Sequence, residues 1–270
     1  MKAIKIYLLY TTLISIFFFL SGNGFTGDYK LPDTGIEKCY DNDSEMTCPS
    51  LGEPFYGQDA QYVGHQLSYR DNGDDTITDL NTGLMWQKWD DQNDAGGRTW
   101  ESAIDYCRDA TTGGYTTWRL PSRRDLVSLV YYDYQAGYAS ISRTYFPDCL
   151  YSLYWTNTTF PYPTYYDEYA DAYSVSFYGG YVGPKKKDEA HYVRCVRGEP
   201  IPQPSFYDNG DGIISDAATH LMWQQTDDQN AAGGRTWENA LDYCETLTWP
   251  SGGHSDWRLP SIRELAVCRS

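Results

Sequence analysis

Basic residues are scarce in this chain, and their scarcity argues against one large class of partners. Lysine and arginine contribute 21 residues against 37 aspartates and glutamates, which gives a formal charge of −16 over 270 residues. A nucleic acid or an anionic membrane is bound through a broad basic field that displaces counterions. The only basic run, Lys185 to Lys187, is interpreted as a solvated loop. We therefore expect no nucleic-acid partner.

Sequence motifs of catalysis and metal binding are also missing. The four histidines are scattered, and neither Gly-x-Ser-x-Gly nor His-Glu-x-x-His occurs. None of the seven cysteines falls in a Cys-x-x-Cys pair, so a zinc site or a thioredoxin-like redox pair is unsupported. Cys149 is isolated and is interpreted as a buried or spare thiol. The sequence favours a protein that is not an enzyme.

Long apolar runs are confined to the N-terminus. Lys2 and Lys5 precede the stretch IYLLYTTLISIFFFL, and small residues follow it, as in a secretory signal peptide. We expect residues 1–24 to be removed and the protein to be secreted or held at the cell surface or in the periplasm. An uncleaved anchor is the alternative, but the stretch is short for a membrane span and contains Thr and Ser. No stable membrane span is expected after cleavage.

A segment of the sequence occurs twice. GGRTWESAIDYC at 96–107 returns as GGRTWENALDYC at 233–244, an offset of 137 residues that becomes 139 by the motif WRLPS. The period is too long for a solenoid repeat, so it indicates a tandem domain. We place the first copy at 66–198 and a partial second copy at 205–270.

The remaining segments are a leader and a linker. Residues 25–65 are rich in Gly, Asp and Pro and are predicted to be irregular, with Cys39 and Cys48 placed to close a small loop. A proline-rich linker covers 199–204. The second copy lacks the C-terminal half of the unit. We expect a truncated product or a fragmentary sequence, or alternatively a half domain that pairs with the first domain or with another chain as an oligomer.

Within the unit, turn residues and β-forming residues alternate at both ends. YRDNGDDTITDLNTGLMWQ reads as a hairpin, and YWTNT, AYSVSFY and HYVRCVRG read as later strands. Two helices are predicted between them, the first after Thr99 and the second after Ser122, which stands at capping-box spacing from Asp125. The second copy offers Ser261 and Glu264 at the same spacing. The fold class is therefore α+β, with a sheet assembled from both ends of the unit.

Two groups of residues are candidates for ligand binding. In DNGDDTITD the oxygens of Asp71, Asp74 and Asp79 suit calcium, but the spacing is wrong for an EF-hand, and Asn-Gly favours a hairpin turn instead. The second group lies in residues 151–181, which contain nine tyrosines. Exposed tyrosines among small polar residues are typical of a binding surface, here at Tyr162, Tyr165, Tyr166, Tyr169 and Tyr181. Tryptophans Trp86, Trp118 and Trp155 are interpreted as core rather than as sugar-stacking rings.

Five motifs follow one another along the unit: DNGDDTITDLNTGLMWQ, TWESAIDYC, WRLPSRRDLVSLV, YWTNT and YVRCVRG. Together they resemble the Lcl C-terminal domain family over about 66–198. From residue 205 the resemblance covers only the N-terminal half of the unit. The resemblance implies a C-type-lectin-like fold, related to the scaffold of formylglycine-generating enzymes. It also implies a disulfide between the first helix and the last strand, here Cys107 to Cys195. Cys149, Cys244 and Cys268 have no assigned pairing.

These observations together predict an exported, noncatalytic recognition or adhesion module that binds a glycan or a cell-surface protein. The resemblance implies sulfated polysaccharides as ligands, whereas the acidity of the chain favours a neutral glycan or a protein. An enzyme on the formylglycine-generating-type scaffold and a structural envelope module without a discrete ligand are the alternatives.

Overall fold

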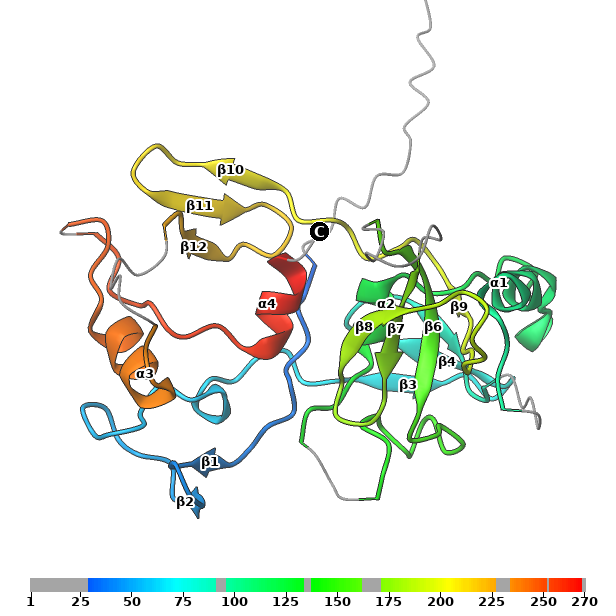
Figure 1. Cartoon of the computed structure of the whole chain (residues 1–270), viewed down its shortest axis with the longest axis horizontal. Coiled ribbons are helices and arrows are strands. Elements are labelled where there is room, and N and C mark those ends of the chain that lie inside the picture. Colours follow the sequence, from blue (N-terminus) through cyan, green and yellow to red (C-terminus); the bar gives the residue numbers. More distant parts are fainter. Residues whose placement is uncertain are drawn as a thin grey trace, which may run out of the picture.

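The computed structural model describes residues 29–90, 96–133, 137–161, 171–226, 234–251 and 253–268. Within these residues the chain is α+β, with small antiparallel sheets and short helices (Figure 1). No helix in this part of the chain has the length and the apolar character that a membrane crossing requires. The predicted signal peptide, residues 1–24, lies outside the described residues.

The first sheet is built from both ends of the first repeat. Strands β3 (Tyr69–Asp71), β4 (Thr76–Asp79) and β5 (Met85–Gln87) form the predicted antiparallel hairpins, and β9 (Val196–Arg197) pairs with the outer edge of β5. Gly73, in the β3–β4 turn, has a φ of 78°, the left-handed conformation that glycine adopts without strain. The predicted closure of the sheet by a late segment is confirmed.

The two predicted helices of the first repeat are present. Helix α1 (Trp100–Asp109) buries Ala103 and Cys107, and a short 3₁₀ turn (Thr112–Gly114) follows it. Helix α2 (Arg123–Ser128) begins with the predicted capping box, because Ser122 accepts from the Asp125 backbone N–H and the Asp125 carboxylate accepts from that of Ser122. The disulfide Cys107–Cys195 joins α1 to the segment that enters β9, as the family resemblance implied.

A second sheet packs against α2. It contains β6 (Leu153–Thr159), β7 (Ala172–Ser176) and β8 (Val182–Lys185), each antiparallel to its neighbour. The aromatic rings of the first repeat fill the space around both sheets, and Trp86 and Trp155 have no exposed surface while Trp118 is 4% exposed. The interpretation of these three tryptophans as core residues is confirmed.

The second repeat reproduces the first half of the fold. Strands β10 (Phe206–Asp208), β11 (Ile213–Asp216) and β12 (Met222–Gln224) form a three-stranded sheet with the register of β3, β4 and β5, since Ile214 faces Trp223 as Ile77 faces Trp86. Helices α3 (Trp237–Thr246) and α4 (Ile262–Cys268) follow. Glu264 and Ser261 form the predicted reciprocal cap at the start of α4.

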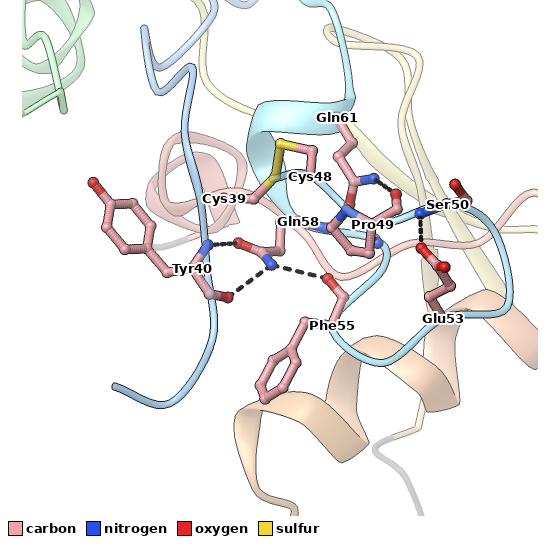
Figure 2. Close-up of a disulfide and its surroundings, with 10 residues drawn as sticks. Cys39, Tyr40, Cys48, Pro49, Ser50, Glu53, Phe55, Gln58 and Gln61 are labelled. Atoms are coloured by element: carbon pink, nitrogen blue, oxygen red, sulfur yellow. Dashed lines mark hydrogen bonds between the residues drawn. A yellow bond between two sulfur atoms is a disulfide. The ribbon is translucent and has the colours of Figure 1, made fainter. Parts of the chain in front are cut away.

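The leader forms ordered structure against the second repeat, where the sequence suggested only an irregular segment. Strands β1 (Cys39–Tyr40) and β2 (Glu45–Met46) form a hairpin closed by the Cys39–Cys48 disulfide, and a 3₁₀ turn (Asp59–Gln61) follows. Figure 2 shows the Gln58 amide tying this loop together: it accepts from the Tyr40 backbone N–H and donates to the Tyr40 carbonyl, both at 2.9 Å.

Side-chain and backbone contacts attach the leader to the second repeat. The Tyr62 hydroxyl donates to the Glu245 carboxylate of α3, and the Phe55 and Trp237 ring centroids lie 6.1 Å apart. The backbone N–H of Tyr29 donates to the carbonyl of Ala218 at 3.2 Å. In Figure 1 the leader, in blue, accordingly runs beside α3 and α4. The leader therefore packs against the second repeat.

Helix α4 docks on α2 through a single buried arginine. Arg263 is 2% exposed, and its guanidinium donates to the carbonyls of Val127 and Ser128, each at 3.0 Å, and to that of Val130. These carbonyls lie at the C-terminal end of α2 and just beyond it, where a cation is favourable. The second repeat thus caps a helix of the first.

Candidate functional site

Most of the predicted tyrosine site lies outside the described residues. Tyr162, Tyr165, Tyr166 and Tyr169 fall in the segment 162–170, for which the structure gives no description. Tyr181 is described: it immediately precedes β8, its side chain is 66% exposed, and its ring lies over Gly183. The structure therefore places one of the five predicted residues at the surface.

Three further exposed tyrosines surround the same turn between β7 and β8. The Ser140 backbone N–H donates to the Phe177 carbonyl at 2.7 Å, which brings the segment before Ser140 beside the turn. The rings of Tyr151 and Tyr178 pack edge to face, with centroids 4.3 Å apart. We call the exposed tyrosines of this region, 40–66% exposed, the tyrosine surface: Tyr138, Tyr151, Tyr178 and Tyr181.

The sequence analysis did not single out Tyr138, Tyr151 or Tyr178. Tyr138 lies outside the tyrosine-rich stretch and reaches the turn through contacts across about 40 residues of sequence. Tyr151 and Tyr178 are inside the stretch, but their spacing alone does not place them side by side. Only the tyrosine composition of 151–181 signalled that a surface of this kind would form.

A groove runs from Tyr181 between β8, α2 and α4. Its volume is about 340 Å³, and its walls are mainly apolar and aromatic side chains, including Tyr173 and Val182. Among the residues that the structure describes, three arginines line it, Arg123, Arg124 and Arg263, and no aspartate or glutamate does. We call this cavity the α2–α4 groove. An apolar cleft with a few convergent polar groups is the usual form of a ligand site.

The arginines of the groove are held in different ways. The Arg123 guanidinium carbon lies 5.0 Å from the centre of the Tyr173 ring, within cation–π distance. Arg124 donates to the Pro202 carbonyl at 3.3 Å. The Arg263 guanidinium donates to the carbonyls at the end of α2, as described above. In a chain of net charge −16 this groove is a local exception, and it can accept a ligand that carries negative groups.

The three candidate calcium ligands act as turn residues. Asp71 accepts from the Gly73 backbone N–H and pairs with Lys88 at 2.8 Å, and Asp74 accepts from Thr76. Asp79 is buried and accepts from the Thr82 hydroxyl at 2.7 Å; burial raises the pKa of its carboxyl. The described residues contain no group of three acidic, histidine or cysteine side chains arranged to hold a metal ion. The geometry favours the turn interpretation, and calcium binding here stays a prediction.

Four cysteines of the described chain form disulfides, and Cys149 is a buried thiol. Both anticipated disulfides, Cys39–Cys48 and Cys107–Cys195, are present, and the prediction of these pairs is confirmed. Cys149 is a buried thiol, and burial raises its pKa to about 11 although Arg194 lies nearby. A thiol with that pKa is almost wholly protonated at neutral pH, and the protonated form is a poor nucleophile.

The comparisons with known proteins give one family. The sequence model of the Lcl C-terminal domain matches residues 75–197 and 212–269, which include the β4–β5 and β11–β12 hairpins, helices α1 to α4 and the disulfide between α1 and the β9 segment. No protein with a curated description matches the chain. On the strength of the two matched segments, the chain belongs to the Lcl C-terminal domain family.

Proposed function

We propose that this protein is an exported, noncatalytic recognition module that binds a glycan across the tyrosine surface and the α2–α4 groove. One observation carries the proposal: Tyr181 is 66% exposed at a groove of about 340 Å³ in which every charged lining residue that the structure describes is an arginine. Tyrosine rings stack on sugar faces and donate hydroxyl hydrogen bonds at low entropic cost. Arg123, which lies over the Tyr173 ring in the groove, supplies a guanidinium for a carboxylate or sulfate group.

The positive charge of the groove bears on the choice between a neutral and an anionic ligand. The net charge alone favours a neutral glycan or a protein, but the ligand meets the local field of the groove. Arg123, which lies against Tyr173, is a cation beside an aromatic platform. An acidic or sulfated glycan is therefore favoured over a neutral one.

Two structural features support the finer fold proposal, a C-type-lectin-like domain. The terminal strand β9 returns to the sheet begun by β3, and the Cys107–Cys195 disulfide links the first helix to that terminal segment. The resemblance implied the disulfide, and the sequence pattern of the repeat implied the return of the late strand. A domain closed in this way leaves the loop between β6 and β7 free to vary without loss of the core.

The test is binding of the full mature chain to immobilised neutral and sulfated glycans in about 0.15 M salt. We expect saturable binding to a sulfated glycan, weakened about tenfold by Tyr181→Ala, which is the loss of a contact of about 1.4 kcal/mol. Tyr207→Ala is the matched control, because Tyr207 is also exposed, at 56%, but lies on β10 and does not line the groove. Arg123→Gln removes a positive charge from the groove, so it should weaken binding of a sulfated glycan more than binding of a neutral one.

The outcomes of this binding test distinguish the proposed glycan site from the alternative functions. Equal binding by the Tyr181→Ala and Tyr207→Ala variants would remove the tyrosine surface as the site, and no binding to any glycan would favour the structural envelope module. A parallel series with a calcium chelator tests the Asp71 turn. Thiol titration of the folded protein tests the noncatalytic assignment, since a rapidly alkylated Cys149 would contradict a pKa of about 11.

A further inference from the structure

The second repeat covers one of its turns with a tryptophan ring. Trp249 follows α3, and its indole N–H donates at 3.2 Å to the carbonyl of Gly212, which lies in the turn between β10 and β11. A Cβ atom at Gly212 would lie 3.0 Å from the indole ring, so the ring is in close contact with the backbone of the turn. The second repeat thus fills this place with a flat aromatic side chain of its own.

The first repeat carries a threonine at the position of this tryptophan. The indole N–H of Trp118 donates to the Thr112 carbonyl at 3.1 Å. In the second repeat the indole N–H of Trp257, the counterpart of Trp118, donates in the same way to the Trp249 carbonyl at 3.2 Å. Thr112 is therefore the structural counterpart of Trp249, and its small side chain leaves room that an indole would fill.

A pocket of about 500 Å³ lies at the corresponding place in the first repeat. The counterpart of Gly212, at an offset of 137, is Asp75 in the β3–β4 turn, and the two residues have left-handed backbones, with φ of 86° and 64°. Asp75 and Thr112 both line the pocket, together with Trp89 and Tyr106. We call it the Trp89 pocket. It lies between the β3–β4 turn, the residues that follow β5 and the C-terminal end of α1, which is at the right of Figure 1.

The two aromatic rings of the pocket already attract cations of the chain itself. The Lys88 Nζ lies 5.5 Å from the centre of the Trp89 ring, and the Arg98 guanidinium carbon lies 4.4 Å from that of Tyr106. The Trp89 indole N–H donates to the Asp75 carboxylate at 2.9 Å, and this bond to an anion makes the ring face more negative. Trp89 is 40% exposed, so part of its ring can contact a further cation.

The charged side chains that line the described part of the Trp89 pocket are all aspartates: Asp75, Asp90 and Asp109. Asp109 pairs with Arg108 at 3.0 Å, which compensates part of its charge, and Asp90 is buried and accepts from the Tyr154 hydroxyl at 2.8 Å. The C-terminal end of α1 adds the negative partial charge of its carbonyl groups. The pocket therefore combines aromatic rings with a negative potential.

These carboxylates suit an organic cation better than a metal ion. The described residues contain no group of three acidic, histidine or cysteine side chains close enough to hold a metal ion, so the aspartates of the pocket are spread around it. An alkylammonium group carries its charge on a larger, partly apolar surface, which aromatic faces and carboxylates attract without the close coordination that a metal ion needs.

We propose that the Trp89 pocket binds an alkylammonium group, with the rings of Trp89 and Tyr106 against its aliphatic carbons and the aspartates supplying the opposite charge. The group is either a trimethylammonium head group or the ammonium end of a lysine side chain. The proposal goes beyond glycan recognition, because the described linings of this pocket and of the α2–α4 groove share no residue and carry opposite charges.

The test compares two probes of the same shape that differ in charge. Choline, and its neutral analogue in which a tert-butyl group replaces the trimethylammonium group, are each titrated into the full mature chain in about 0.15 M salt. The readout is the indole N–H resonance of Trp89 in heteronuclear NMR, identified by its loss in Trp89→Leu. We expect a saturable shift with choline, and a dissociation constant at least about tenfold lower than that of the neutral analogue. Both probes are added to the unsubstituted chain, so this comparison does not depend on the folding of a variant.

A third probe, N-acetyl-lysine amide, distinguishes the two sources of the ammonium group. Binding tighter than that of choline would assign the pocket to a lysine side chain of a partner protein, and weaker binding would assign it to a trimethylammonium head group. Methyl glucoside serves as the neutral sugar. If it binds as tightly as choline, the pocket is a sugar site and the proposal is wrong.

Two variants with the same change of charge locate the effect. Asp75→Asn removes one negative charge but keeps an oxygen for the Trp89 indole, and asparagine tolerates the left-handed φ of 64°. It should weaken choline binding about fivefold. Glu101→Gln removes one charge from an exposed position of α1 outside the described lining and should change binding less than about twofold. Circular dichroism of both variants identifies loss of folding.

Equal binding of choline and its neutral analogue, or saturation without a shift of the Trp89 resonance, would overturn the proposal. Equal weakening by Asp75→Asn and Glu101→Gln would also overturn it, since binding would then follow the net charge of the chain. Tyr181→Ala should leave choline binding unchanged because Tyr181 lines the α2–α4 groove, so failure of the glycan proposal and failure of this one are distinguishable.

Discussion

The two hairpin sheets of this protein have the same strand register and very different burial. Trp86 and Trp223 occupy equivalent positions, opposite Ile77 and Ile214, yet Trp86 has no exposed surface and Trp223 is only half-buried. The local sequence is therefore sufficient to set pairing and register, because turn residues and alternation act over a few residues. Burial depends on strands that arrive from elsewhere, and the first repeat alone has them among the described residues.

The largest effect is expected when the Cys107–Cys195 disulfide of the first repeat is removed. Cys107→Ser with Cys195→Ser opens a loop of 88 residues and should lower the free energy of unfolding by about 4.5 kcal/mol in the chain-entropy model. Cys39→Ser with Cys48→Ser opens a much shorter loop and should cost about 2.5 kcal/mol. Urea unfolding followed by hydrogen exchange at β4 and β5 measures the difference. Equal losses would mean that loop length does not control the effect.

The equivalent tryptophans provide the second comparison. Trp86→Ala should cost about 4 kcal/mol because it empties a fully buried site, and Trp223→Ala about 2 kcal/mol because its ring already contacts solvent. Urea midpoints of the two variants, each compared with the unsubstituted chain, decide the point. If Trp223→Ala costs as much as Trp86→Ala, the exposed fraction of the ring does not determine the cost.

The third comparison sets Arg263 against Arg124, its counterpart at an offset of 139. Arg263→Met removes the hydrogen bonds that the guanidinium donates to the carbonyls of Val127, Ser128 and Val130 in a buried site and should cost about 3 kcal/mol. Arg124→Met removes the hydrogen bond to the Pro202 carbonyl but leaves the end of α2 capped, and should cost less, about 1 kcal/mol. Thermal unfolding and limited proteolysis after α4 measure the docking of the second repeat. Similar proteolysis of both variants would contradict the capping role of Arg263.

The smallest predicted effect is a pH dependence of the α4 cap. Burial alone raises the pKa of Glu264, but the hydrogen bonds and charge of Arg258 outweigh it and hold that pKa below its usual value. The ionised carboxylate therefore stabilises the fold above the pKa of about 4.3 found in unfolded chains, and this contribution is lost as pH falls through the lower folded pKa.

Hydrogen exchange of α4 between neutral and acidic pH measures this loss. Glu264→Gln should reduce the stability of α4 at neutral pH and flatten its dependence on pH. Glu238→Gln, on α3, is the control and should preserve the dependence. An unchanged profile in Glu264→Gln would assign the acid sensitivity to other groups.

The elements that the sequence predicted are those whose information is local. The hairpins, the start of α2 at its Ser122–Asp125 capping box and the burial of Trp86 all follow from patterns shorter than about ten residues. The pairing of Cys107 with Cys195 required the family resemblance as well, because spacing does not determine connectivity.

The contacts that the sequence did not indicate join distant segments. Tyr62 reaches Glu245 across 183 residues, and Arg263 reaches Val127 across 136. Arg263 in the motif SIREL reads as an ordinary surface arginine of a helix, and only the approach of α2 makes it a buried cap. The α2–α4 groove depends on that approach, and for this reason the sequence named Tyr181 but not the arginines beside it.

The late arrival of β9 has a consequence for synthesis of the chain. Translation at about 5–20 residues per second takes roughly 5–20 s to cover the roughly 110 residues between β5 and β9. Hairpins form within microseconds, so β5 completes its pairing with β4 and then waits with its outer edge uncovered. Every nascent chain therefore passes through an interval in which the first repeat resembles the second.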